Sequence, residues 1–452
     1  MSSSFDPRLL ADFARYYGFH YGVCDPQALV KDLVIEMERG LTGDESTLPM
    51  IPSWIKPLSS VPHGRTVLAL DAGGTNMRAA LVSFDEQGKA IAHDISKTHM
   101  PGTKGRLDRN AFFDEIAALA GPLLEKQAVD GIGFCFSYPM EATEDADGIL
   151  MSFSKEVDAP EVIGAAVGAE LRKALERRGT AYKGKIVLLN DTVSTLLSGQ
   201  IEIPANGGLI RGEDIYGAGA GPVIGFILGT GMNIAYPETR IPKIGWDRPD
   251  ESQIIVCETG AFNPRYTGRL DDDFDKTTKN PGHYRFEKTM AGAYLGPLSL
   301  VMLKKAIGDG VLDFDRSNDI LSMEGLQTKD LNQFMHAPLT GEGPLGSLFA
   351  KHERDALASF CYLVSIITRR AALFAAATVA SAVEKAGAGF DPFAPVRIAV
   401  EGTTYMIYKG MRTSLESYLN TMLQTKAPRN IAIAPVEQAS LFGAAAAALS
   451  KD

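Results

Sequence analysis

Cysteine and histidine are scarce in this sequence, and each shortage argues against a class of site. The four cysteines, Cys24, Cys135, Cys257 and Cys361, show no CxxC spacing. Neither a disulfide framework nor a cysteine zinc site is therefore expected, and a reduced, cytoplasmic chain is favoured. The seven histidines form no cluster, which gives little support to a histidine metal site or a catalytic triad.

Positive charge is also in deficit. The 452 residues include 45 Lys and Arg against 55 Asp and Glu, a formal net charge of −10, and such a chain is poorly suited to nucleic acid or to an anionic membrane surface. The amino terminus has no basic segment followed by an apolar one, so no secretory signal is expected. The longest apolar stretches, 371–383 and 439–449, are shorter than the ~20 residues that a membrane span needs. We expect no binding to nucleic acid or membrane.

Two common phosphate-binding motifs give no support. No GxxxxGK[ST] sequence occurs, and the GxGxxG match at 341–346 follows no buried strand, so we interpret that match as a loop.

The chain has 45% hydrophobic and 22% charged residues, as a globular protein does, and its length favours two domains. Helices are predicted at 7–40, 110–126, 162–178, 285–306 and 345–385, and strands at 131–136, 185–189, 253–258 and 430–434. This alternation favours an α/β layer fold.

A glycine-centred hairpin organises the chain. In Val67–Ser83 an apolar run ends at Asp71, Gly73-Gly74 follows, and a second apolar run comes next. We expect these glycines to adopt turn angles that other residues avoid, and their N–H groups to face a polyphosphate. Asp71, at the strand end, is placed to approach a metal ion or its water shell.

The same design recurs later. Val223–Tyr236 surrounds Gly229-Thr230-Gly231 with apolar runs, and Val396–Thr404 has the same order of strand and then glycine. Such repetition predicts two halves that face each other across a cleft, a favoured position for a ligand. The chain is predicted to hold a nucleotide.

Polar residues follow other predicted strands. Asp191, next to Asn190, lies where a general base could take a proton from a hydroxyl that attacks a γ-phosphoryl group. It could equally be the N-cap of a helix at 192–200, and the local sequence favours neither role. Polar residues beside apolar runs are singly more often structural, but as a set these favour a polyol pocket: Ser137, Asn190, Asn233, Glu258 and Glu287.

Taken in order, these segments resemble the motifs of the hexokinase family, in the actin-like ATPase superfold, from about Leu48 to Leu449. The similar segments are Pro49–Trp54, before the first phosphate motif; Leu70–Arg78, that motif; Gly133–Pro139, the sugar signature, with Lys155 where its lysine lies; Leu189–Val193, the catalytic aspartate motif; Gly229–Asn233, the second phosphate motif; Glu258–Phe262 and Asn280–Lys288, the sugar glutamate segments; and Val400–Thr404, the adenosine motif.

The resemblance implies an ATP-dependent hexokinase that phosphorylates a hexose, first of all glucose, at the 6-hydroxyl, the first step of glycolysis. It implies Asp191 as the base, with Lys155 as the second catalytic residue. The implied sugar-binding residues are Ser137, Ser154, Lys155, Asn190, Asp191, Asn233, Glu258 and Glu287. The implied ATP-binding residues are Asp71, Gly73, Gly74, Thr75, Asn76, Arg78, Gly229, Thr230, Gly231, Gly402, Thr403 and Thr404, with Mg²⁺ reached by Asp71 through water.

Several residues depart from the family pattern. Phe153-Ser154 stands in place of Trp-Thr, Thr259 in place of Trp, Tyr284 in place of Gln, and Glu401 in place of Asp. The first three leave the choice among glucose, mannose and fructose open. Two other kinds of function remain as alternatives, a catalytically silent hexose sensor and an actin-like assembly protein.

The expected architecture is α/β, a two-lobed actin-like ATPase (ribonuclease H-like) fold with a central cleft. Residues 67–197, completed by the C-terminal helix 437–452, form the expected small lobe, and 198–436 the large lobe, on which 1–66 pack as helices and linker. The expected partners are a hexose and MgATP, without nucleic acid or membrane, for a cytoplasmic monomer or homodimer.

Overall fold

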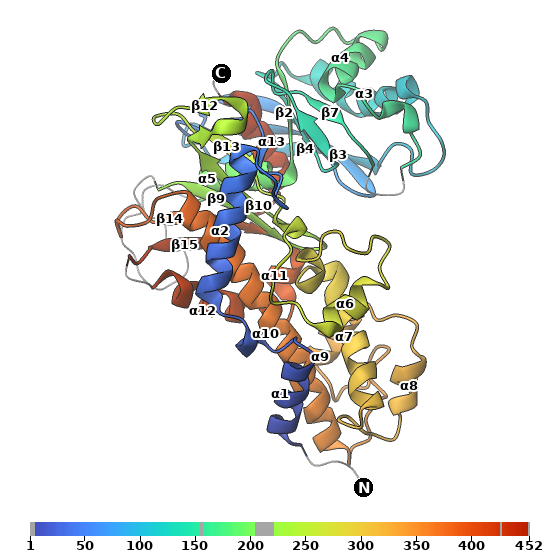
Figure 1. Cartoon of the computed structure of the whole chain (residues 1–452). Helices are drawn as coiled ribbons and strands as arrows, with labels where there is room; N and C mark the ends of the chain where they lie inside the picture. Colours follow the sequence, from blue (N-terminus) through green and yellow to red (C-terminus); the bar gives the residue numbers. More distant parts are fainter. Residues whose placement is uncertain (1–4, 154–156, 204–220, 425–426, 451–452) are drawn as a thin grey trace.

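The computed structural model describes residues 5–153, 157–203, 221–424 and 427–450. Two β-sheets lie one above the other, and a pair of helices, α5 (Asp191–Glu202) and α13 (Ala439–Leu449), lies between them (Figure 1). The smaller sheet with its outer helices is called the small lobe here, and the larger sheet with its helices the large lobe. The carboxyl ends of strands from both sheets therefore meet near the amino terminus of α5.

The small lobe is built on a five-stranded sheet. Its strands are β2 (Arg65–Ala72), β3 (Asn76–Phe84), β4 (Ala90–His99), β5 (Ile132–Phe136) and β8 (Ile186–Leu189). Their order is β4-β3-β2-β5-β8, with β2, β5 and β8 parallel and the β2-β3-β4 meander antiparallel. Helices α3 (Arg109–Lys126) and α4 (Val167–Arg177) cover one face and α13 the other. Because both faces are covered, β5 is buried throughout, as its continuous apolar run predicts.

The large lobe is built on a six-stranded sheet. Its strands are β1 (Ile51–Pro52), β9 (Val223–Leu228), β10 (Met232–Glu238), β13 (Gln253–Val256), β14 (Val396–Glu401) and β15 (Ile431–Pro435). Their order is β1-β13-β10-β9-β14-β15, with α5 packed on β9, β10 and β14. Helix α10 (Arg354–Lys385) contacts β9 and β10, and α2 (Pro26–Thr42) and α12 (Met411–Leu423) pack on it.

Helix α10 is the element of the described chain that is long and apolar enough to cross a membrane, and it is longer than the apolar run read from the sequence. Of its most apolar 18-residue window, 89% is buried inside the protein. We therefore identify α10 as a core helix.

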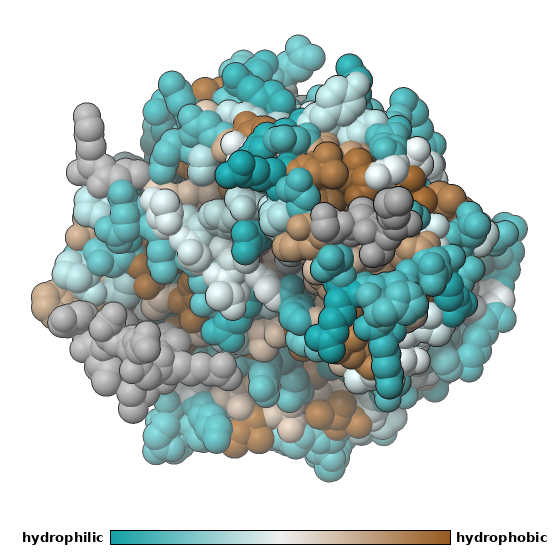
Figure 2. Space-filling model, turned by 90° about the horizontal axis from the view of Figure 1, so that it is seen from below, coloured by the Kyte–Doolittle hydropathy of each residue, from teal (hydrophilic) through white to brown (hydrophobic). Residues whose placement is uncertain are grey.

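The remaining elements are α7 (Gly292–Gly308), which packs on α10, and shorter helices and strands. The shorter elements are α1 (Pro7–Tyr16), α6 (Arg269–Asp275), α8 (Ser317–Ser322), α9 (Thr328–His336), α11 (Thr403–Ile407), the 3₁₀ helices η1 (Tyr21–Val23), η2 (Pro160–Val162), η3 (Pro242–Ile244), η4 (Thr259–Ala261) and η5 (Glu287–Thr289), and the strands β6 (Met140–Ala142), β7 (Gly148–Leu150), β11 (Arg240–Ile241) and β12 (Trp246–Asp247). The outer surface is mainly hydrophilic on the face that Figure 2 shows, with hydrophobic residues in separate patches.

Glycines bring the four central layers into backbone contact. A Cβ on Gly133 of β5 would lie 1.8 Å from the Ala444 carbonyl oxygen of α13, and one on Gly443 of α13 would lie 1.9 Å from the Ser194 carbonyl oxygen of α5. On the far side, a Cβ on Gly225 of β9 would lie 2.4 Å from the Thr192 carbonyl oxygen of α5. Real Cβ atoms do not approach so closely, so each interface requires glycine.

The predicted helices and strands are found, with shifted ends. The helix expected at 285–306 begins at Gly292. The region expected as one helix at 7–40 divides into α1, η1 and α2. The break occurs because Gly18 has a left-handed backbone (φ +76°) and Asp25 caps a new helix that starts with Pro26. Helix α5 runs to Glu202, so the proposed lobe boundary between 197 and 198 falls inside it. The lobe boundaries stay a prediction.

Candidate active site

The first hairpin connects β2 to β3. Asp71, 7% exposed, is the penultimate residue of β2, and Gly73, Gly74 and Thr75 form the tip before Asn76 opens β3. Neither glycine has a positive φ, so the expectation of left-handed turn angles is wrong here. What the missing side chains leave at this tip is an unobstructed backbone.

The carbonyl groups of this tip all point into the protein. The Tyr138 hydroxyl lies 3.1 Å from the Gly73 carbonyl oxygen and 3.3 Å from that of Gly74, and the Met100 N–H donates to the Thr75 carbonyl at 3.0 Å. Within the described residues, the N–H groups of Gly74 and Thr75 have no hydrogen-bond acceptor. Two adjacent donors are thus left for an anion, as in a backbone nest.

The second hairpin, between β9 and β10, repeats this arrangement with other partners. The Gly229 carbonyl accepts from the Gly292 N–H and from the Thr404 hydroxyl, both at 2.8 Å. The Thr230 carbonyl accepts from the Ala293 N–H at 3.0 Å. Here too, no described acceptor lies opposite the N–H groups of Thr230 and of the following Gly231.

Glycine is required around the second hairpin for steric reasons. Gly402 has φ +123°, and a Cβ there would lie 2.3 Å from the Leu228 carbonyl oxygen. A Cβ on Gly231 would lie 2.9 Å from a carboxylate oxygen of Glu287. The predicted adenosine motif, with Gly402, Thr403 and Thr404, is thus packed directly on the second hairpin.

Asp71 is paired with a residue of its own hairpin. Arg78 donates to Asp71 Oδ2 from Nε at 2.8 Å and from Nη2 at 2.6 Å, and also to the Ser440 hydroxyl on α13 at 2.9 Å. Arg78, predicted to bind ATP, therefore also links the hairpin to the helix between the lobes. Among the described residues, the Oδ1 atom of Asp71 makes no hydrogen bond.

Asp191 is predicted as a general base or as a helix N-cap, and the structure shows which residue caps α5. Asn190 is the N-cap of α5, because its side-chain oxygen accepts from the Thr192 N–H at 2.8 Å, while Asp191 is the first residue inside the helix. The expected alternative of Asp191 as the cap is therefore wrong. Asp191 Oδ1 also accepts from the Thr192 N–H at 2.8 Å, and the positive end of the helix dipole stabilises its charged form.

Two of the predicted sugar residues of the large lobe, Asn233 and Glu258, bond to each other, and the third, Glu287, bonds to the main chain beside Asn233. Asn233 donates to Glu258 Oε1 at 2.5 Å and accepts from the Glu258 N–H at 3.0 Å. Glu287 accepts from the Met232 N–H at 3.0 Å. Glu258 has a left-handed backbone, φ +54°, a costly conformation for a residue with a side chain, and such strain gathers at functional sites.

Three buried carboxyl groups in this region have raised pKa values. Burial and the charge of Asp191 raise the pKa of Glu258 to about 7, although the Asn233 hydrogen bond opposes this. Burial and Asp191 likewise raise the pKa of Glu401 to about 7, and burial raises the pKa of Glu287. Burial and neighbouring negative charge thus disfavour the charged forms of these groups, and buried carboxyls of this kind gather at functional sites.

The other predicted residues have varied positions. Ser137 follows β5, and its N–H donates to the Ala72 carbonyl at 3.2 Å, which joins the sugar signature to the first hairpin. Ser154 and Lys155 lie outside the described residues. Tyr284, 47% exposed with φ +52°, lies near Glu258 and Glu287. Sequence reasoning did not identify Tyr138, Met100, Gly292 or Ala293, whose contacts join segments far apart in the chain.

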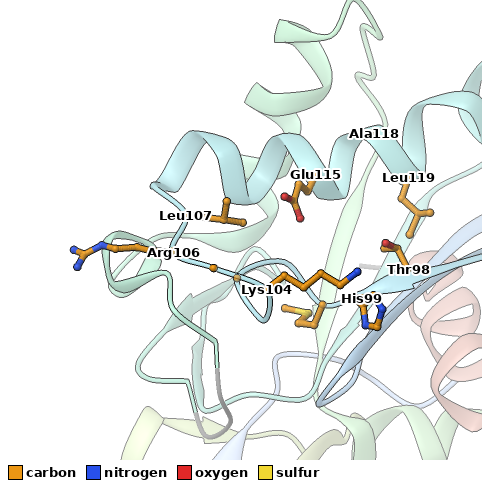
Figure 3. A pocket seen from close by; sticks show the side chains of 11 residues that line it. Thr98, His99, Lys104, Arg106, Leu107, Glu115, Ala118 and Leu119 are labelled. Atoms are coloured by element: carbon orange, nitrogen blue, oxygen red, sulfur yellow. The ribbon is translucent and has the colours of Figure 1, made fainter.

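Two cavities lie near the hairpins. One of about 560 Å³ is lined by Gly292, Ala293, Pro297 and residues 325–329, so it borders the backbone groups that hold the second hairpin. The other, of about 580 Å³, lies between the end of β4 and α3 and is lined by Thr98, His99, Lys104 and Glu115 among others (Figure 3). None of the predicted site residues lines the second cavity.

No group of three or more His, Cys, Asp or Glu residues in the described parts of the chain could hold a metal ion. A magnesium ion that arrives with ATP needs less, because it is bound through one or two carboxylates together with the substrate phosphates. Asp71, with one carboxylate oxygen left by Arg78, fits that requirement.

Known proteins resemble this chain in sequence and in fold. Two family models described as Hexokinase match residues 18–201 and 223–450. Hexokinase-7 of Oryza sativa is 28% identical over 91% of this chain and 90% of its own length, and Hexokinase-1 of Schizosaccharomyces pombe is 29% identical over 91% and 84%. The hexokinase from Schistosoma mansoni complexed with glucose aligns at a TM-score of 0.74 and 23% identity, covering 98% of this chain and 99% of that one.

The last match confirms the predicted two-lobed α/β fold. The second family model alone covers half of the chain, and the two together cover most of it. The chain belongs to the hexokinase family, whose members are kinases that phosphorylate hexoses with ATP as substrate.

Proposed function

We propose that this hexokinase transfers the γ-phosphoryl group of MgATP to the 6-hydroxyl of glucose, with Asp191 as the general base. The observation that carries the proposal is the position of Asp191 at the amino terminus of α5, in electrostatic contact with Glu258 and Glu401. Both glycine hairpins have N–H groups without an acceptor among the described residues. In this proposal a base, a sugar-binding group and two anion sites lie around one point.

In this proposal each lobe holds one part of the reactants. Asn233, Glu258 and Glu287 form hydrogen bonds with the sugar hydroxyls. Asn190 and Ser137 contact the sugar from the small lobe. Asp191 accepts the 6-hydroxyl proton, and the two hairpins bind the phosphates through the N–H groups of Gly74, Thr75, Thr230 and Gly231. Ser154 and Lys155 keep their proposed sugar contacts from the family resemblance. Water must be excluded, since it would compete with the 6-hydroxyl, and lobe closure on the sugar provides this.

Mg²⁺ enters as part of the nucleotide. Asp71 would hold it through a water molecule, and the ion would neutralise charge that develops on the phosphates. The cavity of about 560 Å³ beside Gly292 and Ala293 is the position we propose for the adenosine. The four cysteines are free thiols, which suits the reducing cytoplasm, where we propose that the reaction takes place.

The base assignment is tested with Asp191→Ala. We expect kcat to fall by about 10²–10⁴, the usual contribution of a general base, while glucose still binds. The measurement is a coupled assay of ADP release together with calorimetric titration of glucose. Asp108→Ala is the control, because Asp108 caps α3 through the Ala111 N–H and its loss weakens a helix end without touching the site. A near-normal kcat for Asp191→Ala would contradict the proposal.

The substrate is tested by the same assay with glucose, mannose, fructose, N-acetylglucosamine or no sugar. We expect the highest kcat/KM with glucose and no turnover once EDTA has removed Mg²⁺. Faster turnover of another hexose would change the named substrate but not the role of Asp191. Glucose binding without turnover of any hexose would favour the sensor alternative.

A further inference from the structure

Tyr138 holds the first hairpin in a way that sequence motifs do not indicate. It follows Ser137 at the end of β5 and is 3% exposed. Its ring packs against Phe136, with ring centroids 4.9 Å apart, and against Phe153 at 5.3 Å. The hydroxyl is therefore fixed in place, 3.1 and 3.3 Å from the carbonyl oxygens of Gly73 and Gly74.

The geometry of a peptide unit gives this contact a consequence for the opposite side of the hairpin. The carbonyl of one residue and the N–H of the next lie in one plane and point in opposite directions. A hydroxyl that holds the Gly73 and Gly74 carbonyls inward therefore directs the N–H groups of Gly74 and Thr75 outward. These are the two N–H groups of the tip that have no acceptor among the described residues.

Without this hydroxyl, two shielded carbonyls would lose their side-chain partner. Buried carbonyl groups without a partner are costly, and glycine peptides rotate with little steric resistance. The Gly73–Gly74 and Gly74–Thr75 peptides could then turn their carbonyl oxygens toward the nucleotide, where they would repel phosphate. The Thr75 carbonyl would still be held by the Met100 N–H.

We propose that Tyr138 is a positioning residue for the phosphoryl donor, which fixes two peptide units of the first hairpin with their N–H groups toward the ATP phosphates. This inference rests on the proposed role of the hairpin in binding ATP. Burial raises the pKa of Tyr138 to about 12, so the phenol keeps the proton that it donates throughout the working pH range. The Ser137 N–H also donates a hydrogen bond to the Ala72 carbonyl. Ser137 and Tyr138 thus both join the predicted sugar signature to the first hairpin.

The test is Tyr138→Phe, which keeps the packed ring and removes only the hydroxyl. We expect the KM for ATP to rise by about tenfold, the size of one well-placed hydrogen bond, while the KM for glucose stays within twofold. Calorimetric titration of ADP should show the same loss. Thermal unfolding of the variant is measured in parallel, because a merely structural role would lower stability without separating the two KM values.

Tyr182→Phe is the matched control. Tyr182 lies in the same lobe, is half-buried, and donates to the Lys185 carbonyl at 3.1 Å, so the same type of bond is lost far from the hairpin. We expect neither KM to change. Equal effects of the two variants, or an unchanged KM for ATP in Tyr138→Phe, would overturn the inference.

A third variant, Gly74→Val, separates failure of the inference from failure of the proposed function. Its side chain would project from the tip where we propose that phosphate binds. If Gly74→Val raises the KM for ATP and Tyr138→Phe does not, the hairpin binds ATP and Tyr138 does not position it. If neither changes the KM for ATP, the proposed role of the hairpin is itself wrong.

Discussion

The two glycine hairpins reach a similar pattern of backbone hydrogen bonds by different means. Each turns its tip carbonyls away from the site and leaves two adjacent N–H groups without a described partner. The second hairpin is held mainly by main-chain groups, the N–H groups at the start of α7, with the Thr404 hydroxyl as a supplement. The first is held at two of its carbonyls by a single phenol, that of Tyr138.

This difference determines which substitutions can affect each hairpin. Main-chain donors cannot be removed by changing a side chain, so the second hairpin is sensitive to added volume rather than to lost hydroxyls. In the first hairpin, loss of the Tyr138 hydroxyl would leave the Gly73 and Gly74 carbonyls without their side-chain partner. The comparison predicts that two hairpins with similar hydrogen bonding differ in their tolerance to mutation.

The largest effect is expected from an attempt to break the main-chain support of the second hairpin. In Gly292→Ala the new Cβ would lie 2.3 Å from the Thr404 hydroxyl and 2.7 Å from the Gly229 carbonyl oxygen, so the hairpin or α7 must move. We expect a loss of about 1–3 kcal/mol in the free energy of unfolding, as for other overpacked sites, and a rise of at least tenfold in the KM for ATP. Urea unfolding and steady-state kinetics measure both.

Gly308→Ala is the control for that variant. Gly308 ends the same helix, and a Cβ there would meet nothing within 4 Å, so we expect unchanged kinetics. If Gly292→Ala behaves as Gly308→Ala does, the second hairpin is not held by α7 in the way described.

A smaller effect is expected from Thr404→Val. The Gly229 carbonyl would lose its hydroxyl partner but keep the Gly292 N–H at 2.8 Å. We therefore expect the KM for ATP to rise only about twofold to threefold, less than in Tyr138→Phe, with a loss of ~1 kcal/mol in the free energy of unfolding. Thr378→Val, which removes a buried hydroxyl bond to Phe374 in α10, controls for stability. A larger kinetic effect than that of Tyr138→Phe would reverse the comparison.

The smallest effect concerns charge between the hairpins. Glu401 faces Asp191, Asp71 and Arg78, and its Thr195 hydrogen bond spans 3.3 Å. Its pKa of about 7 lies above that of an unfolded glutamate, so the folded state binds the proton more tightly. The proton on Glu401 therefore adds to the free energy of unfolding. This contribution is complete below about pH 4.3, the pKa of an unfolded glutamate, and is lost as the pH rises through about 7.

Glu401→Gln should flatten this pH dependence. We expect the variant to lose less free energy of unfolding than the wild type between pH 5.5 and pH 8, by urea titration, and its KM for ATP to rise less over that range. Part of the slope remains, because Glu258 titrates in the same range. Glu45→Gln, at an exposed position, serves as control. Identical slopes for Glu401→Gln and the wild type would contradict the assignment.

The sequence predicted the fold class because its signals are local. Apolar runs that end at Asp71, Ser137 and Asn190 mark buried strands, and the glycine hairpins lie between strands as expected. The order of the family motifs then placed the chain in its family. The lobe boundary was harder to locate, since α5 follows a strand of one lobe and packs on the sheet of the other.

What the sequence could not predict depends on contacts between distant segments. Whether Asn190 or Asp191 caps α5 depends on which of the two has the extended backbone that precedes the helix. The sequence does not decide this, because Asn and Asp are both preferred N-caps. The role of Tyr138 requires that residues 65 positions apart meet, and the raised pKa of Glu401 requires that three strand ends converge. The glycines of both hairpins were predicted to supply left-handed turn angles, and none of Gly73, Gly74, Gly229 and Gly231 has a positive φ. Close packing explains Gly231, where a Cβ would lie 2.9 Å from Glu287, but not Gly73, where it would lie 3.6 Å from the Asn76 carbonyl oxygen.

The three glycine contacts through the central layers have a mechanical consequence. At Gly133, Gly443 and Gly225 the backbone of one element nearly touches that of the next, so the four layers cannot be compressed, and sliding would bring neighbouring side chains into collision. If the lobes close on the sugar as proposed, these contacts favour a rotation about the helix pair over a sliding motion. Asp191, at the amino terminus of α5, would then be displaced little, so the proposed base would stay in place while the lobes rotate.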